Sequence, residues 1–76
     1  MNIDDAGAPP LEVSVNGQAH TLAASTTLAD LIVRLGHVPD GIATALNGEF
    51  VARSERHQHF LHDGDQVTCF QAIVGG

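Results

Sequence analysis

The sequence contains no lysine, tryptophan or tyrosine, and it has only one cysteine, Cys69. A single cysteine cannot form an internal disulfide, so the core has to hold without one, as in reducing compartments. The three basic residues are all arginines and stand against nine acidic residues, which gives a formal net charge of −6. Such a surface, without Trp or Tyr for base stacking, argues against nucleic-acid binding.

Long apolar runs are also missing. None approaches the roughly 20 residues that a membrane-spanning helix needs, and the opening residues lack the basic-then-apolar order of a signal peptide. We therefore expect a cytoplasmic protein with no membrane association. A chain of 76 residues makes one domain that buries only about 60% of its unfolded surface, which leaves little room for a deep catalytic pocket. Function is expected on the surface or at a chain end.

The first half of the chain predicts a leader, a hairpin and a helix. Residues 1–10 are acidic and small and end in two prolines, so we expect a disordered leader before a domain over residues 11–76. Apolar and polar residues alternate over residues 11–15, which predicts a strand, and Asn16-Gly17 predicts a type I′ turn into a second strand over residues 18–23.

The helix is predicted from one apolar stripe, formed at i, i+3, i+4 and i+7 by Leu28, Leu31, Ile32 and Leu35. Thr27 is suited to its N-cap with Asp30 three residues later, and Gly36 to its end. Asp30 and Arg34 are spaced to pair on the exposed side of the helix.

The second half predicts three more strands. Residues 42–46 and 49–52 flank a second Asn-Gly pair, and residues 66–73 are rich in strand-forming side chains. Residues 54–62 have no clean period, so we expect a loop or short helical turn, held to the core by Phe60 and Leu61. Burying a single helical stripe predicts an α+β fold in which a mixed sheet of about five strands curls around one main helix.

The sequence ends in Gly75-Gly76, two residues without a Cβ. Such an end can adopt backbone angles closed to other residues, which suits a carboxylate that a partner enzyme has to reach and activate. Alternation in the last predicted strand places Phe70 on the face opposite Cys69 and Gln71. One face should cover the helix and the other should form an apolar patch near the tail, but the pattern does not say which is which.

The order of elements resembles the β-grasp fold of ubiquitin-like proteins, and several motifs resemble the ThiS family of sulfur carrier proteins in thiamin biosynthesis. The match runs from about Leu11 to Gly76, and residues 1–10 have no counterpart. The motifs that carry it are Val15-Asn16-Gly17, the helix over residues 27–35, the run ALNGEFVAR from Ala45 to Arg53, DGDQV from Asp63 to Val67, and FQAIVGG from Phe70 to Gly76.

The resemblance implies that the protein is a co-substrate rather than an enzyme. It implies that a ThiF-like enzyme adenylates the carboxylate of Gly76 with ATP and magnesium, and that a sulfur donor enzyme converts it to a thiocarboxylate. The carrier would deliver that sulfur to a ThiG-like thiazole synthase, holding no bound cofactor or metal itself and remaining monomeric when free. Partner contacts are expected in the tail over residues 73–76 and at Phe70, that is at Phe70, Ile73, Val74, Gly75 and Gly76.

Other functions remain open at this point. Molybdopterin-synthase small subunits share the diglycine but typically carry a Phe-Pro-Pro-like segment where this chain has Phe70-Gln71-Ala72. Carriers of cysteine, methionine or natural-product sulfur pathways use the same tail. A ubiquitin-like protein modifier would use the same activated glycine, and a regulatory ligand-binding β-grasp module would use no tail chemistry.

A metal site is the alternative that the histidines raise. His57, His59, His62 and Cys69 are ligand types that zinc prefers, but they lack the paired spacing of zinc-binding folds. His57 and His59 would share a strand face as exposed edge residues. We expect no metal, and we expect Cys69 to be a small buried or half-buried apolar side chain.

Overall fold

The computed structural model describes residues 8–71 of the chain. Its elements follow the expected order, with two short 3-10 helices (η1 and η2) added between the strands. They are β1 (Leu11–Val15), β2 (Gln18–Leu22), α2 (Leu28–Arg34), η1 (Pro39–Gly41), β3 (Ile42–Leu46), β4 (Glu49–Val51), η2 (Arg53–Gln58) and β5 (Gln66–Gln71). Of the leader expected over residues 1–10, residues 1–7 lie outside the described residues, and so do residues 72–73 of the last expected strand.

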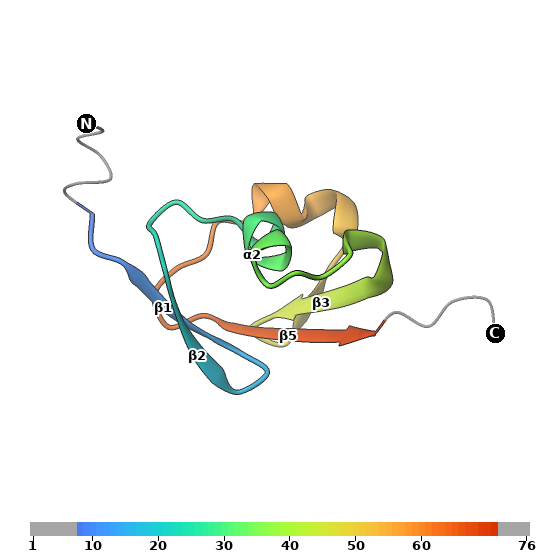
Figure 1. Cartoon of the computed structure of the whole chain (residues 1–76), viewed down its shortest axis with the longest axis horizontal. Coiled ribbons are helices and arrows are strands. Elements are labelled where there is room, and N and C mark those ends of the chain that lie inside the picture. The colour runs from blue at the N-terminus through green and yellow to red at the C-terminus, as the bar shows by residue number, and fades with distance from the viewer. Residues whose placement is uncertain (1–7, 72–76) are drawn as a thin grey trace.

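The five strands form one mixed sheet in the order β2-β1-β5-β3-β4. β5 is the central strand and runs parallel to β1 and antiparallel to β3, while the two outer pairs are antiparallel hairpins. The helix α2 and the segment η2 lie on the same side of this sheet (Figure 1). The predicted architecture, a mixed sheet of five strands around one main helix, is confirmed.

Both hairpins turn at Asn-Gly pairs, as predicted. Asn16 and Gly17 have φ values of 51° and 87°, and Asn47 and Gly48 have 52° and 86°. A type I′ turn requires positive φ at both central residues, and Asn and Gly adopt that conformation more readily than other residues. The two turns therefore set the register of both outer hairpins.

The helix begins with the predicted capping box. Thr27 accepts a hydrogen bond from the main chain of Asp30, and the Asp30 carboxylate accepts one from the Thr27 N–H, each at 3.1 Å. The expected ion pair between Asp30 and Arg34 is not formed, because the Asp30 carboxylate is turned back to the first turn. Gly36 follows the helix with a φ of 83° and ends it as predicted.

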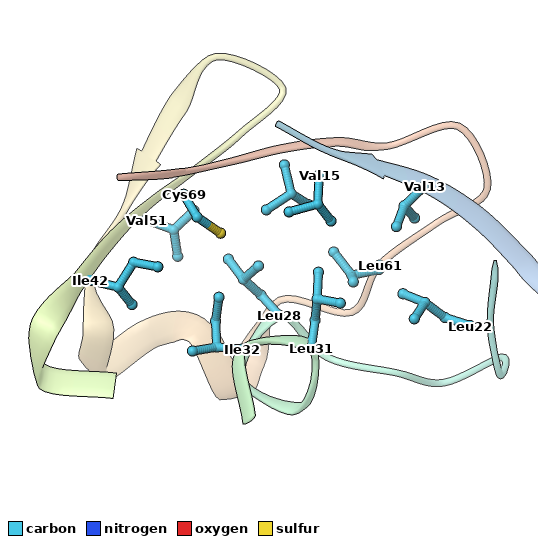
Figure 2. Close-up of a cluster of buried hydrophobic side chains, with 11 residues drawn as sticks. Val13, Val15, Leu22, Leu28, Leu31, Ile32, Ile42, Val51, Leu61 and Cys69 are labelled. Carbon is cyan, nitrogen blue, oxygen red and sulfur yellow. The ribbon is translucent and has the colours of Figure 1, made fainter. Parts of the chain in front are cut away.

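The core lies between α2 and the sheet. Leu28, Leu31 and Ile32 of the helix are buried against strand residues (Figure 2). No helix within residues 8–71 is long and apolar enough to cross a membrane. The buried apolar cluster consists of Val13, Val15, Leu22, Leu28, Leu31, Ile32, Ile42, Val51, Leu61, Val67 and Cys69.

The segment after β4 was only partly predicted. It forms the 3-10 helix η2 and then an extended stretch, in which Leu61 is buried but Phe60 is 54% exposed. The expectation that Phe60 holds this segment to the core is wrong. The stretch pairs with the main chain before the helix, through His59, Leu61 and a bridge between Thr27 and Phe60. In such an extended stretch neighbouring side chains point opposite ways, and Leu61 takes the inner position.

Candidate functional site: the open sheet face and the end of the last strand

The central strand β5 leads toward the predicted reacting end of the chain. It pairs with β3 over its last residues, with Thr44 opposite Cys69 and Ile42 opposite Gln71. On its other side it pairs with the end of β1 at Val67. The end of β5 at Gln71 is therefore paired with β3, whereas β1 pairs with β5 only near its start.

The structure answers which side of β5 faces the helix. Val67 and Cys69 are buried toward α2, whereas Thr68 and Phe70 are exposed on the opposite side, which we call the open face of the sheet. Phe70 is 47% exposed there. The predicted position of Phe70 in an apolar patch near the tail is compatible with this placement, and its contact with a partner stays a prediction.

A second aromatic side chain on the open face was missed by the sequence analysis. Phe50 of β4 is 69% exposed and lies opposite Ala45 of β3, while Phe70 lies opposite Ala43 of the same strand. Both alanines share the open face because the Thr44 between them points into the core. Two small side chains thus separate two exposed phenylalanines, and the four form one apolar patch: Ala43, Ala45, Phe50 and Phe70.

The neighbours of Phe50 do not show which way it faces. Alternation puts Glu49 and Val51 on one face of this short strand and Phe50 on the other, so a charged residue shares the face of Val51 and the pattern leaves the inner face undecided. What could not be read locally is that β4 and β5 both flank β3, which brings Phe50 and Phe70 to the same surface.

Beneath this surface, Arg56 of η2 is buried, with 3% of its surface exposed. Its guanidinium donates hydrogen bonds to Thr44 Oγ1 at 3.0 Å, to the Pro39 carbonyl at 3.1 Å and to the Ile42 carbonyl at 2.5 Å. Burial lowers the pKa of the Arg56 guanidinium from its usual value. Burial also raises the pKa of the Cys69 thiol, an effect partly offset by the positive charge of Arg56.

The raised pKa of Cys69 favours its protonated form, whereas the thiolate is the nucleophilic form. The prediction that Cys69 is a small buried side chain is confirmed, because it is 8% exposed among core residues.

The three histidines that raised a metal site occupy the segment after β4, whereas Cys69 belongs to β5. His57 belongs to η2 and His59 follows it, so the expectation that these two share a strand face is wrong. His62 Nδ1 lies 3.9 Å from a carboxylate oxygen of Asp65. Within residues 8–71, no three His, Cys, Asp or Glu side chains are placed to hold a metal ion together.

The tail residues Ile73, Val74, Gly75 and Gly76 lie outside the described residues. Their predicted roles, in partner binding and at the reacting carboxylate, therefore stay predictions that rest on the sequence.

Comparison with known proteins shows which family this chain resembles. The family model described as the ThiS family matches residues 13–76. The chain is 38% identical over 66 residues to the sulfur carrier protein ThiS of Escherichia coli strain K12, a match that covers 87% of this chain and 100% of that protein. It is also 32% identical over 66 residues to a thiazole synthase of Magnetococcus marinus, where the match covers 87% of this chain but 20% of that protein.

Solved structures agree on the fold. The crystal structure of the thiamine biosynthesis protein ThiS from Geobacter metallireducens superimposes with a TM-score of 0.76 at 28% identity, covering 87% of this chain and 100% of that one. A ubiquitin of Caldiarchaeum subterraneum superimposes with a TM-score of 0.51 at 16% identity, covering 92% and 100%. The second match bears on the fold alone, which is the ubiquitin-like β-grasp.

Proposed function

The chain belongs to the ThiS family and is a sulfur carrier protein, and we propose that it carries its sulfur on the carboxylate of Gly76. The observation that supports this most is that the family match runs to residue 76 and so includes the final Gly75-Gly76 pair. The similarity to part of a thiazole synthase supports a role in forming the thiazole of thiamin.

The proposed chemistry occurs in two steps at the same carboxyl group. A carboxylate oxygen of Gly76 attacks the α-phosphorus of ATP in a ThiF-like activating enzyme that uses magnesium, and pyrophosphate leaves. A sulfide equivalent from a sulfur donor enzyme then attacks the acyl carbon, AMP leaves, and the chain ends in a thiocarboxylate. Adenylation is needed because a free carboxylate is a poor electrophile, and the C(O)S⁻ group is a soft nucleophile that a ThiG-like thiazole synthase can use.

In this proposal the catalytic groups belong to the partners. The carrier supplies a terminal carboxylate on two residues without a Cβ, which can pass along a narrow channel. Because the proposed activation consumes ATP, a cytoplasmic location is part of this proposal. The carrier therefore has to be recognised by its surface before its tail can react.

The apolar patch on the open face is the docking surface we assign to the activating enzyme. Phe50 and Phe70 stand on either side of β3, each opposite an alanine, so they present two aromatic rings with little between them. Aromatic side chains that become fully buried are the usual centres of protein–protein interfaces. The patch also lies on the strand that leads to the tail, so docking there brings Gly76 near the partner.

The proposal is tested by ATP–pyrophosphate exchange with the cognate activating enzyme. Deleting Gly76 moves the terminal carboxylate by one residue, about 3.5 Å, and a misplacement of 1 Å can cost on the order of 100-fold in rate. We expect the deletion, and equally the addition of one residue after Gly76, to abolish exchange without lowering the melting temperature. Normal exchange by the deleted chain would mean that the Gly76 carboxylate is not the reacting group.

Intact-protein mass spectrometry of the chain purified from its own cells separates the possible functions. A mass gain of one sulfur-for-oxygen replacement supports the carrier. A ladder of conjugates to other proteins would instead indicate a protein modifier, and an unmodified chain under thiamin starvation would contradict the proposal.

A further inference from the structure

The central strand β5 alternates its main-chain hydrogen bonds between two neighbours. Val67 and Cys69 bond toward the β1 side: Asn16 N–H donates to the Val67 carbonyl at 2.9 Å, and the Asn16 side chain bonds to both main-chain groups of Cys69. Gln66 bonds toward β3, since its carbonyl accepts from Asn47 N–H at 2.7 Å. In an antiparallel pair this direction alternates residue by residue. The N–H and C=O of Gln71 therefore point to the β1 side.

At the level of Gln71, β1 no longer runs beside β5. The chain turns away at Asn16 and Gly17, where positive φ values reverse it into β2. Within residues 8–71, the structure gives the N–H and C=O of Gln71 no hydrogen-bond partner on this edge. The central strand β5 thus extends beyond the end of its neighbour β1.

The adjacent strand ends differently. The Ile42 carbonyl of β3 also lies beyond the end of its neighbouring strand, because β4 ends at Val51. At that position the buried guanidinium of Arg56 donates a hydrogen bond to the carbonyl. Asn16 likewise substitutes for a strand residue at Cys69. Side chains of the fold satisfy both of those positions, whereas the corresponding groups of Gln71 have no such partner among residues 8–71.

A groove of about 410 Å³ lies at the Gln71 end of β5. It is lined by Gly36, His37, Val38, Gly41, Ile42 and Gln71. The first three of these follow α2, so the groove is on the helix side of the sheet, while Phe70 marks the open face at the same end of β5. Apart from His37 and Gln71 its lining carries only aliphatic side chains or none.

We infer that the activating enzyme adds an extended segment of its own chain to this edge of β5, pairing its main chain with the N–H and C=O of Gln71. Side chains of an added strand point alternately to the two faces. One apolar side chain of the segment occupies the groove, and the next lies on the open face beside Phe70. This inference rests on the proposed function, because it assigns a second contact to the same partner.

Main-chain pairing would fix the position of the partner along β5, which contacts at an apolar patch alone would not do. Side-chain contacts tolerate sliding, but main-chain pairing fixes the register of the two chains, and a slip of one residue turns every side chain to the wrong face. From Gln71 the remaining five residues of the sequence can span at most about 17 Å. Fixing the register at Gln71 therefore fixes where the carboxylate of Gly76 can reach.

The test removes one hydrogen-bond donor from the main chain. Cys69 allows residues 69–76 to be made as a synthetic peptide and joined to residues 1–68 by native chemical ligation, with no change in sequence. An ester in place of the amide between Phe70 and Gln71 removes the Gln71 N–H and leaves every side chain in place. In ATP–pyrophosphate exchange with the cognate activating enzyme, we expect its KM for the carrier to rise about 3- to 10-fold, with a melting temperature close to that of the all-amide chain.

The matched control is an ester between Cys69 and Phe70. It removes the Phe70 N–H, which by the same alternation bonds to β3 opposite Ala43. This control should lower the melting temperature and leave KM unchanged below the transition. Val38→Glu supplies a second probe, because it places a charge at the rim of the groove on a side chain that is already exposed, and it should raise KM without lowering stability.

An unchanged KM for the Gln71 ester would overturn the inference, and so would a loss of melting temperature as large as that of the control. If the Gln71 ester exchanges normally while deletion of Gly76 abolishes exchange, the proposed function stands and the added strand does not.

Discussion

Asn16 and Cys69 exchange two hydrogen bonds although they lie 53 residues apart. The Cys69 N–H donates to Asn16 Oδ1 at 2.8 Å, and Asn16 Nδ2 donates to the Cys69 carbonyl at 3.1 Å. The carboxamide thus takes the place of a strand residue where β1 has ended. Since Asn16 also starts the first hairpin turn, one residue links the turn at one end of the domain to the strand that precedes the tail.

This double role predicts a large effect of Asn16→Ala on stability. The substitution leaves both main-chain groups of Cys69 without partners and places alanine at positive φ, so we expect a loss of about 2–3 kcal/mol in the free energy of unfolding. Asn16→Gly is the control, since glycine keeps the turn conformation and removes only the amide. Urea denaturation should place it between the wild type and Asn16→Ala. A Gly variant as stable as the wild type would show that the two hydrogen bonds contribute nothing.

A second prediction concerns Arg56, whose guanidinium is buried among uncharged acceptors within residues 8–71. Arg56→Met leaves the Pro39 and Ile42 carbonyls and the Thr44 hydroxyl without their donor, and we expect it to cost about 2–4 kcal/mol. Arg53→Met is the matched control. The Arg53 side chain is exposed and pairs with Asp40 at the surface, where an ion pair is worth about 1 kcal/mol or less. Equal losses in urea unfolding for the two variants would contradict the structural role of Arg56.

Local signals in the sequence account for most of the fold. The two Asn-Gly pairs specify positive φ at successive residues, and the capping box at Thr27 and Asp30 specifies where the helix starts. Each of these is a property of residues within four positions of one another. The predicted strand limits agree with the observed ones to within one residue wherever the structure describes the strand ends.

The features that were missed depend on contacts between distant segments. Arg56 is a charged residue in a segment without period, and only the end of β4 explains why its charge is buried near Ile42. Phe60 was expected to hold its segment to the core, but its pairing with Thr27 directs it outward. The patch at Phe50 likewise required the strand order.

The third prediction uses the residues that the sequence lacks. Without lysine or tyrosine, Cys69 is the only side chain expected to titrate between about pH 8.5 and 11. Its pKa is raised in the folded protein, so the unfolded chain loses its proton first. The stability associated with the protonated thiol is therefore complete below about pH 8.5 and falls as pH rises toward the folded pKa, by at most about 1.4 kcal/mol per pH unit.

The measurement is urea unfolding across this range for the wild type and for Cys69→Ala. The alanine variant removes the titrating group, so its stability should fall less steeply with pH than that of the wild type. Parallel pH profiles for the two proteins would mean that burial does not protect the thiol in the folded state.

The fourth prediction separates docking from folding at the apolar patch. Phe50→Ala and Phe70→Ala remove side chains that are 69% and 47% exposed, so each should lower the free energy of unfolding by no more than about 1 kcal/mol. If the open face docks the activating enzyme, each truncation removes an interface anchor, and such residues typically contribute about 2 kcal/mol or more to binding. The KM for the carrier in ATP–pyrophosphate exchange should then rise about 30-fold.

Phe60→Ala is the matched control, because Phe60 is an aromatic residue of similar exposure, at 54%, that lies next to Thr27 outside the sheet. It loses the same atoms and should leave KM unchanged, which excludes a general effect of removing exposed apolar surface. An effect at Phe50 and Phe70 alone would locate the docking surface on the open face, since only this face presents both residues to one partner. A rise in KM for Phe60→Ala, with none for Phe50→Ala and Phe70→Ala, would place the docking surface on the helix side of the sheet.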